Sequence, residues 1–215
     1  MRLRPEEPAA GPWRVEPIVD VVARLLGSQR PAVIGIDGRS SSGKTTLARR
    51  MADAAAATST TAVVHSDDIA WHHSIFGWVD LLLDGVVEPV RAGRAVAFRP
   101  PAWEVRDRPG AVEVPAGTEV LIVEGVGVGR PELAELFDAT VWVQSDLEEA
   151  ERRNLVRVEA GEISPAGYEQ WMAEEVPVLA EQRPWERAGL VVAGTPSLAH
   201  DPVSEVVVAS PPGRG

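Results

Sequence analysis

The chain has 215 residues and no cysteine, so we expect a single domain with a sizeable core and exclude disulfides, thiolate metal sites and thiol catalysis. Its 32 acidic side chains outnumber 21 basic ones, and the formal net charge of -11 disfavours nucleic acid and anionic membranes as partners. No apolar run approaches the roughly 20 residues that span a bilayer, and the start of the chain lacks the apolar core of a signal peptide, which predicts a cytoplasmic protein.

Both ends of the chain have a composition that disfavours a packed core. Residues 1–17 are rich in Pro, Glu and Ala, and residues 201–215 end in ASPPGRG. Such segments are typical of flexible tails. The sequence therefore predicts one domain over 18–200, with homo-oligomer formation left open.

Between these ends, short apolar runs alternate with stretches of helical periodicity. The first stretch, 18–26, has apolar residues at helical spacing and is followed by Gly27 and Pro31, which predicts that the helix ends there. The predicted strands are 32–36, 62–65, 120–123, 140–143 and 189–193, and the later predicted helices are 44–57, 131–137, 147–160 and 165–181. This alternation predicts a three-layer α/β fold, with a parallel sheet covered by helices on both faces.

A glycine-rich segment separates the first predicted strand from the helix that follows it. Residues 38–45, GRSSSGKT, match the phosphate-binding pattern G-x-x-x-x-G-K-[ST] in full. In such a loop the backbone N–H groups turn toward phosphate oxygens, and the helix N-terminus adds positive potential. Lys44, the chain's single lysine, is predicted to reach the β- and γ-phosphates, and the Thr45 hydroxyl to ligate magnesium.

This loop predicts a P-loop NTPase or kinase fold with ATP and Mg²⁺ as cofactors. The residues predicted to bind the nucleotide are Gly38, Ser40, Ser41, Ser42, Gly43, Lys44, Thr45, Thr46 and Arg152.

Carboxylates follow the predicted strands at the edge where ligands bind in open α/β sheets. Glu124 is either a group that holds magnesium through water or a solvated strand end. Asp67 or Asp68 is predicted to accept the proton of an attacking hydroxyl, while the other caps a turn. Asp37, directly before the glycines, either approaches the magnesium or caps the loop.

The segment between 93 and 115 carries many Arg and Pro residues and alternating apolar positions, which predicts a small hairpin insertion. Its arginines are either solvated and ion-paired, or Arg106 or Arg108 grips an anionic group of an acceptor. Three tryptophans near this region, Trp71, Trp78 and Trp103, are either core residues or walls of the acceptor pocket.

Arginines also occur on the helix predicted after the fourth strand. Arg152, Arg153 and Arg157 lie there, and the last two share a helix face at i, i+4 spacing. They either close over the phosphates as part of a lid over 147–163 or form surface ion pairs with nearby glutamates. The four histidines lack the spacing of a zinc site, which favours surface or core roles; they are His65, His72, His73 and His200.

With these motifs in order, the chain resembles the uridine kinase-like branch of P-loop small-molecule kinases from about residue 32 to 194. The similar segments are GRSSSGKTT, VVHSDD, LIVEG, DLEEAERRNLVR and AGLVVAG. The resemblance implies that Asp67 is the general base, that Glu124 helps to organise magnesium, and that Arg152, Arg153 and Arg157 belong to an arginine-bearing lid helix. Trp71 and Trp103 stand near positions where the family carries other polar aromatic residues, so an acceptor other than plain uridine or cytidine is expected.

The sequence therefore predicts an ATP-dependent kinase that phosphorylates a hydroxyl of a small molecule, a nucleoside or nucleoside-like compound. Its predicted catalytic residues are Lys44, Asp67, Arg153 and Arg157, and its predicted acceptor residues are Asp68, Trp71, Trp78, Trp103, Arg106 and Arg108. The alternative is a P-loop nucleotide-binding regulator or NTPase without a small-molecule acceptor. A nucleic-acid motor would need a basic track that the net charge disfavours.

Overall fold

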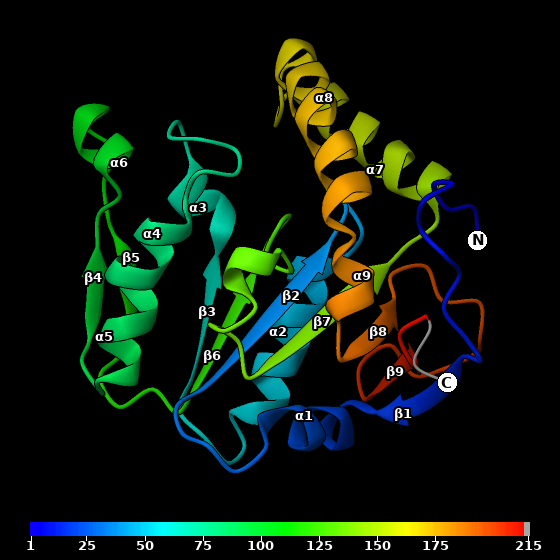
Figure 1. Ribbon diagram of the computed structural model, residues 1–215, viewed down its shortest axis with the longest axis horizontal. Helices are drawn as coiled ribbons and strands as arrows, with labels where there is room; N and C mark the ends of the chain where they lie inside the picture. Colours follow the sequence, from blue (N-terminus) through cyan, green and yellow to red (C-terminus); the bar gives the residue numbers. More distant parts are fainter. Residues whose placement is uncertain (213–215) are drawn as a thin grey trace.

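A seven-stranded sheet with the strand order β1-β9-β8-β7-β2-β6-β3 runs through the molecule (Figure 1). The computed structural model describes residues 1–212. Neighbouring strands from β8 to β3 are parallel, whereas β9 runs antiparallel to β8, and β1 antiparallel to β9. The strands are β1 (Arg14–Pro17), β2 (Ala32–Gly38), β3 (Thr61–His65), β6 (Val120–Glu124), β7 (Ala139–Gln144), β8 (Leu190–Ala193) and β9 (Glu205–Ala209). The predicted parallel α/β class is confirmed.

Helices cover both faces of this sheet because side chains alternate along each strand. Ile34 and Ile122 point to one face, where they pack under α1 (Ile18–Leu26) and α2 (Lys44–Ala55). Their neighbours Val33 and Leu121 point to the other face. That face is covered by α3 (Ser66–Ala70), α4 (Val79–Leu82), the π-helical turn η1 (Leu83–Val87) and α5 (Glu88–Arg91).

Two longer helices rise beyond the carboxyl ends of the strands (Figure 1). They are α7 (Leu147–Glu159) and α8 (Pro165–Gln182), and the short α9 (Pro184–Arg187) follows. Asp146 caps α7 by accepting a hydrogen bond from the Glu149 amide, and Ser164 caps α8 in the same way from the Gly167 amide. The predicted helices of this region are therefore present with nearly the predicted bounds.

The insertion forms a separate small sheet beside α5. Strands β4 (Val96–Phe98) and β5 (Val112–Val114) pair antiparallel, and the short helix α6 (Pro101–Val105) lies between them. The predicted hairpin is present at this place.

Two predictions of flexible ends are wrong for the described residues. Residues 1–17 contain strand β1, and the side chains of Glu7 and Ala10 are buried. Residues 201–212 include strand β9, which joins the main sheet; the last three residues of that predicted tail, 213–215, lie outside the described residues. Val206 and Val208 bury in the same core cluster as the apolar side chains of α1, and this outweighs the turn-forming composition around them.

The predicted helix over 131–137 is also wrong. Only one 3₁₀ turn, η2 (Pro131–Leu133), forms there. The rest of the segment is a connection whose residues Leu133 and Phe137 are buried in the core. Two apolar anchors spaced four residues apart imitate helical periodicity without requiring a full helix.

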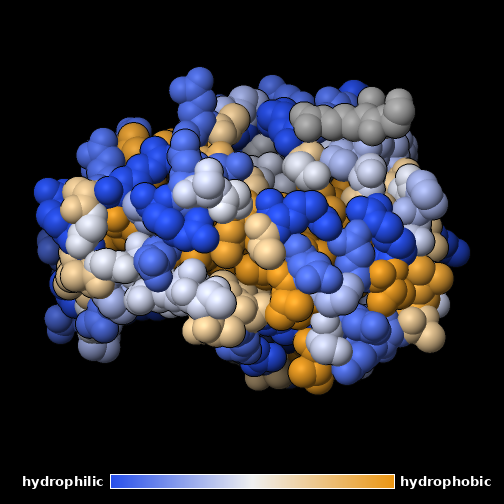
Figure 2. All heavy atoms as spheres, turned by 90° about the horizontal axis from the view of Figure 1, so that it is seen from below, coloured by the Kyte–Doolittle hydropathy of each residue, from blue (hydrophilic) through white to orange (hydrophobic). Residues whose placement is uncertain are grey.

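Seen from below Figure 1, hydrophilic and hydrophobic side chains are interspersed over the surface (Figure 2). Over residues 1–212, none of the helices combines the length and apolar character required to span a bilayer.

Candidate functional site

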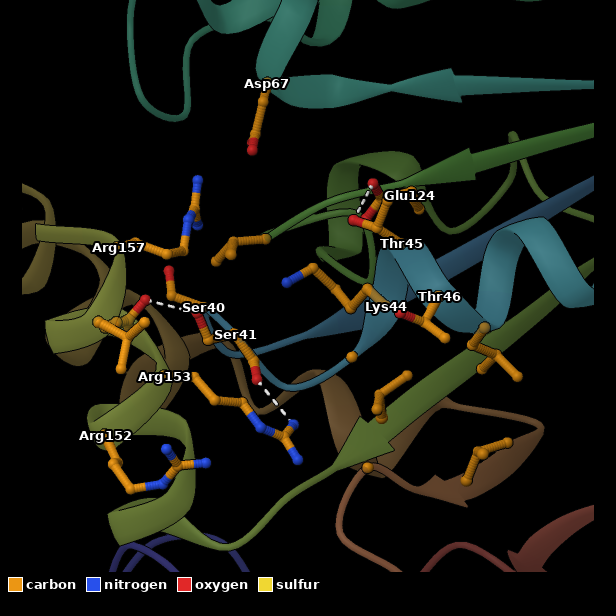
Figure 3. A pocket seen from close by; sticks show the side chains of 18 of the residues that line it. Ser40, Ser41, Lys44, Thr45, Thr46, Asp67, Glu124, Arg152, Arg153 and Arg157 are labelled. Atoms are coloured by element: carbon orange, nitrogen blue, oxygen red, sulfur yellow. Dashed lines mark hydrogen bonds between the residues drawn. The ribbon is translucent and has the colours of Figure 1, made fainter. Parts of the chain in front are cut away.

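A cavity of about 900 Å³ opens at the carboxyl ends of the central strands. The glycine-rich loop forms its floor, α7 and α8 form one wall, and Asp67 in the first turn of α3 faces them (Figure 3). Ligands of open α/β sheets bind at this edge, so the location fits the predicted site. The predicted residues in its lining are Ser40, Ser41, Gly43, Lys44, Thr45, Thr46, Asp67, Glu124, Arg152, Arg153 and Arg157.

The loop itself depends on its two glycines. A Cβ added to Gly38 would lie 2.6 Å from the Ser42 Oγ, and Gly43 has a φ of 104°, which side chains with a Cβ rarely adopt. Helix α2 begins directly afterwards at Lys44. The Lys44 Nζ is buried and donates a 2.9 Å hydrogen bond to the Arg39 carbonyl, so the loop holds the ammonium beside its own backbone.

Three side chains meet at the end of β6. Thr45 Oγ1 donates a 2.8 Å hydrogen bond to Glu124 Oε1, and His65 Nδ1 lies 2.6 Å from the same oxygen. The parallel register places His65 directly beside Glu124. Burial raises the pKa of Glu124, but the hydrogen bond from His65 and the charge of Lys44 outweigh it and lower that pKa. The hydrogen bond to Glu124 in turn raises the pKa of His65.

The Thr45 hydroxyl and the Glu124 carboxylate are adjacent hard oxygen donors, which suit Mg²⁺. In residues 1–212 no group of three or more His, Cys, Asp or Glu side chains could enclose a metal ion. A site of one or two protein oxygens completed by phosphate oxygens and water is the arrangement that magnesium commonly takes with nucleotides. The residues present therefore fit the ion.

Asp67 and Asp68 are consecutive but face different surroundings. The Asp67 side chain extends into the cavity, where Arg157 points toward it from the opposite side (Figure 3). Although Asp67 is exposed to the cavity, the protein around its carboxylate desolvates it in part and raises its pKa; Lys44 opposes this shift. Asp68 Oδ1 instead accepts a 2.6 Å hydrogen bond from Arg108 Nη2. The structure thus separates the two candidates for the base.

The arginines of α7 lie at the cavity and also form ion pairs with nearby glutamates. All three line the cavity. Arg153 Nη1 donates a 3.2 Å hydrogen bond to the Ser41 carbonyl in the phosphate loop. Its Nε, like the guanidinium of Arg152, is bonded to Glu149, and Arg157 pairs with Glu162.

The loop is also anchored by residues that the sequence did not single out. Glu175 of α8 is 2% exposed and accepts a 3.0 Å hydrogen bond from the Ser40 amide. Trp171 Nε1 donates a 2.7 Å hydrogen bond to Ser40 Oγ, and Ser41 Oγ donates one to Asn154. These contacts attach α7 and α8 to the floor of the cavity.

Asp37 is a loop anchor rather than a residue of the cavity lining. Its buried carboxylate accepts hydrogen bonds from the amides of Gly38, Gly127 and Gly129. Burial raises the pKa of Asp37 to about 6, against the opposing effect of these amides and of Lys44. Of the two roles left open for it, capping is the one that this geometry supports.

None of the predicted acceptor residues belongs to the lining of this cavity, and four of them, Asp68, Trp71, Trp103 and Arg108, form a cluster beside it. The Arg108 guanidinium carbon lies 3.6 Å from the centre of the Trp103 ring and 4.9 Å from that of Trp71. Trp103 is buried, and its Nε1 donates to the Asp68 carbonyl. Arg108 therefore covers one face of the Trp103 ring, a candidate wall of the acceptor pocket.

Trp78 and Arg106 lie outside this cluster. Trp78 is 1% exposed and packs in the core, so the prediction that it lines the acceptor pocket is wrong. Its Nε1 is satisfied by the Ile75 carbonyl. Arg106 is exposed and forms no ion pair with any residue of 1–212.

The contact of His65 with Glu124 is not predicted from the sequence, although the position of His65 offers a signal for it. His65 ends a predicted strand two positions before Asp67, and strand ends meet at the edge where the site lies. Glu175, Trp171 and Asn154 reach the loop only through the packing of α7 and α8, and nothing in their local sequence marks them.

No protein-family model matches the chain, and no curated protein matches it. A solved structure described as a putative fructose transport system kinase from Silicibacter sp. TM1040 aligns with a TM-score of 0.57 and 16% identity, over 78% of this chain and 93% of that one. A structure of a possible uridine kinase from Bacillus stearothermophilus aligns with a TM-score of 0.48 and 20% identity, over 81% of this chain and 96% of that one. The first likeness shows that the chain has the fold of a P-loop kinase.

Proposed function

Because the chain has the fold of a P-loop kinase, we propose that it transfers the γ-phosphate of ATP to a hydroxyl group of a small molecule, a nucleoside or nucleoside-like compound. One observation carries the proposal. Lys44, the Thr45–Glu124 pair, Asp67 and Arg157 converge on a single cavity (Figure 3).

Each of these groups has a separate task in phosphoryl transfer. Asp67 accepts the proton of the acceptor hydroxyl, whose oxygen bonds to the γ-phosphorus while the bond to the bridging oxygen of ADP breaks. Its raised pKa, caused by partial desolvation, makes the carboxylate a stronger base than an ordinary Asp. Lys44 and the arginines of α7 stabilise the charge on the phosphate oxygens.

Thr45 and Glu124 would hold Mg²⁺, which when bound neutralises the charge of the phosphate oxygens. The hydrogen bond between them places the hydroxyl and the carboxylate side by side. His65 Nδ1 lies against the same Glu124 oxygen and helps to hold the carboxylate in place.

The acceptor end of the site is the edge formed by Asp68, Arg108 and Trp71. Arg108 and Asp68 are paired and only partly exposed, so this edge offers both a carboxylate and a guanidinium to a polar acceptor. A larger or charged nucleoside-like compound makes better use of such an edge than plain uridine. The net charge of -11 supports a small molecule rather than nucleic acid or a membrane as the partner.

The alternative is a nucleotide-binding regulator or NTPase that hydrolyses ATP without an acceptor. The orientation of Asp67 toward the cavity favours the kinase, since a carboxylate there has a proton to accept from a hydroxyl.

The test is incubation with ATP, Mg²⁺ and a panel of nucleosides, sugars and other hydroxyl-bearing metabolites, followed by mass spectrometry for an added phosphate. We expect one class of acceptor to gain a phosphate and to accelerate ADP formation. Lys44→Ala should lower turnover on the order of 100-fold or more. Arg49 lies on the exposed side of the same helix, so Arg49→Ala is the matched control and should leave turnover unchanged. ATP hydrolysis that no acceptor accelerates would favour the alternative.

A further inference from the structure

The first residues of the chain run along the end of β7 and the beginning of α7 (Figure 1). We call residues 2–10 the N-terminal arm. The Gln144 side chain at the end of β7 donates a 3.0 Å hydrogen bond to the Pro8 carbonyl. The Leu147 amide, in the first turn of α7, donates one of 2.9 Å to the Arg2 carbonyl. The arm is thus attached to the end of β7 and to the first turn of α7 at two separate points.

Between these points the arm buries a carboxylate. Glu7 is 4% exposed, and its Oε1 accepts hydrogen bonds from Trp142 Nε1 at 2.8 Å and from Gln144 Nε2 at 3.0 Å. Its Oε2 pairs with Nη2 of Arg39, which is also 4% exposed. Within residues 1–212, Nε and Nη1 of Arg39 have no hydrogen-bond partner. Glu7 is therefore the side chain that holds this guanidinium.

Arg39 is the second residue of the phosphate loop, so this pair bears on the nucleotide site. The Arg39 carbonyl accepts the hydrogen bond from Lys44 Nζ and a 3.1 Å hydrogen bond from the Ser42 amide. Burial lowers the pKa of Arg39 to about 10, so the guanidinium stays charged at neutral pH. Without the Glu7 charge, a buried cation would be left uncompensated next to the carbonyl that holds Lys44, and an uncompensated buried charge is strongly destabilising.

We propose that Glu7 is a positioning residue for the phosphate loop: it holds Arg39, and through the Arg39 carbonyl it holds the Lys44 ammonium where the β- and γ-phosphates bind. The inference rests on the proposed function, because it assumes that the loop binds ATP. It extends that function to a segment outside the phosphate motif. Glu7 touches no reacting atom and acts only through Arg39.

The experiment compares the affinities of the full chain for Mg·ATP and for AMP by titration calorimetry, in the wild type, Glu7→Gln and Glu6→Gln. AMP lacks the two phosphates that Lys44 is expected to reach. We expect Glu7→Gln to reduce the ratio of ATP affinity to AMP affinity by about tenfold or more, since a buried charged pair is broken. The control Glu6→Gln removes an exposed neighbouring carboxylate and should leave the ratio unchanged.

The possible results distinguish a failure of the positioning role of Glu7 from a failure of the assumption that the loop binds ATP. A general loosening of the fold would weaken both ligands together, and an unchanged ratio in Glu7→Gln would overturn the positioning role. A wild type with no preference for ATP over AMP would overturn the nucleotide assignment itself. If Glu7→Gln does not fold, Glu7→Gln/Arg39→Met removes both buried charges. Its ratio should also fall, and a wild-type ratio in this double variant would overturn the inference.

Discussion

Thr45 in the phosphate loop and Glu124 at the end of β6 are joined by a 2.8 Å hydrogen bond, although 79 residues separate them in the chain. We therefore predict that Thr45→Val and Glu124→Gln each raise the Mg²⁺ concentration required for half-maximal turnover, because each removes one hard oxygen donor of the pair. A magnesium titration at saturating ATP measures this. Thr45→Ser keeps the hydroxyl and should resemble the wild type; a shift of equal size in Thr45→Ser would mean that packing, not the hydroxyl, is responsible.

The different surroundings of Asp67 and Asp68 predict different kinetic effects. Asp67→Asn should lower kcat by about 10²–10⁴-fold with little change in ATP affinity, since a base acts on the acceptor. Asp68→Asn should have a smaller effect, because its carboxylate is bonded to Arg108. Steady-state kinetics with a phosphorylated acceptor measures both, and the reverse order would assign the base to Asp68.

The raised pKa of Asp67 also predicts a pH dependence. A base must be deprotonated to act, so kcat should fall on acidification, with its midpoint above the ordinary Asp value of 3.8. The pH–rate profile of the wild type measures this midpoint. The residual activity of Asp67→Asn should lack that limb, and a limb that persists unchanged in the variant would belong to another group.

The raised pKa of Asp37 predicts that the free energy of unfolding decreases as pH rises through the acid range. Its pKa is about 6 in the fold against 3.8 for a free Asp, so the folded state binds more protons than the unfolded state between these values. The free energy of unfolding should therefore decrease by on the order of 2–3 kcal/mol from pH 4 to 6 on account of this group. Urea unfolding at a series of pH values measures the slope. Asp37→Asn should flatten it, and identical slopes in both proteins would exclude Asp37 as its source.

Arg108 and Arg106 form a matched pair for testing the acceptor edge. Arg108 is stacked on Trp103 and bonded to Asp68, whereas Arg106 is exposed. Arg108→Ala should lower kcat/KM for the acceptor by about tenfold or more while the KM for ATP stays unchanged, since a charge-assisted contact is removed. Arg106→Ala should have little effect. A loss in Arg106→Ala with none in Arg108→Ala would exchange their roles.

The phosphate loop could be predicted because its chemistry is contiguous in sequence: eight residues between an apolar run and a helix specify a backbone conformation. Asp67 and Glu124 could be placed because parallel strands end at the same edge of a sheet. The contact of Glu7 with Arg39 and that of Glu175 with Ser40 join residues 32 and 135 positions apart, and no local pattern encodes such packing.

Trp78 and Trp103 show a second limit of prediction from the sequence. Both follow polar or proline-containing stretches, and their composition does not distinguish a core ring from a pocket wall. The structure decides through their surroundings: Trp78 is enclosed by α4 and its neighbours, while Trp103 carries Arg108 on one face. Composition also fails to predict strand β9, because its valines at 206–208 are flanked by turn-forming residues.

Strand β1 has a consequence for how copies of the chain meet in solution. It lies outermost in the sheet and covers β9, whose three consecutive valines would otherwise form an open apolar edge. Open edges of this kind invite pairing with a strand of another molecule. Within β1 the charged Arg14 and Glu16 and the terminal Pro17 make a poor partner for further strands, and Glu16 is held by Arg24 of α1. The opening residues thus make this edge of the sheet a poor partner for a strand of another molecule.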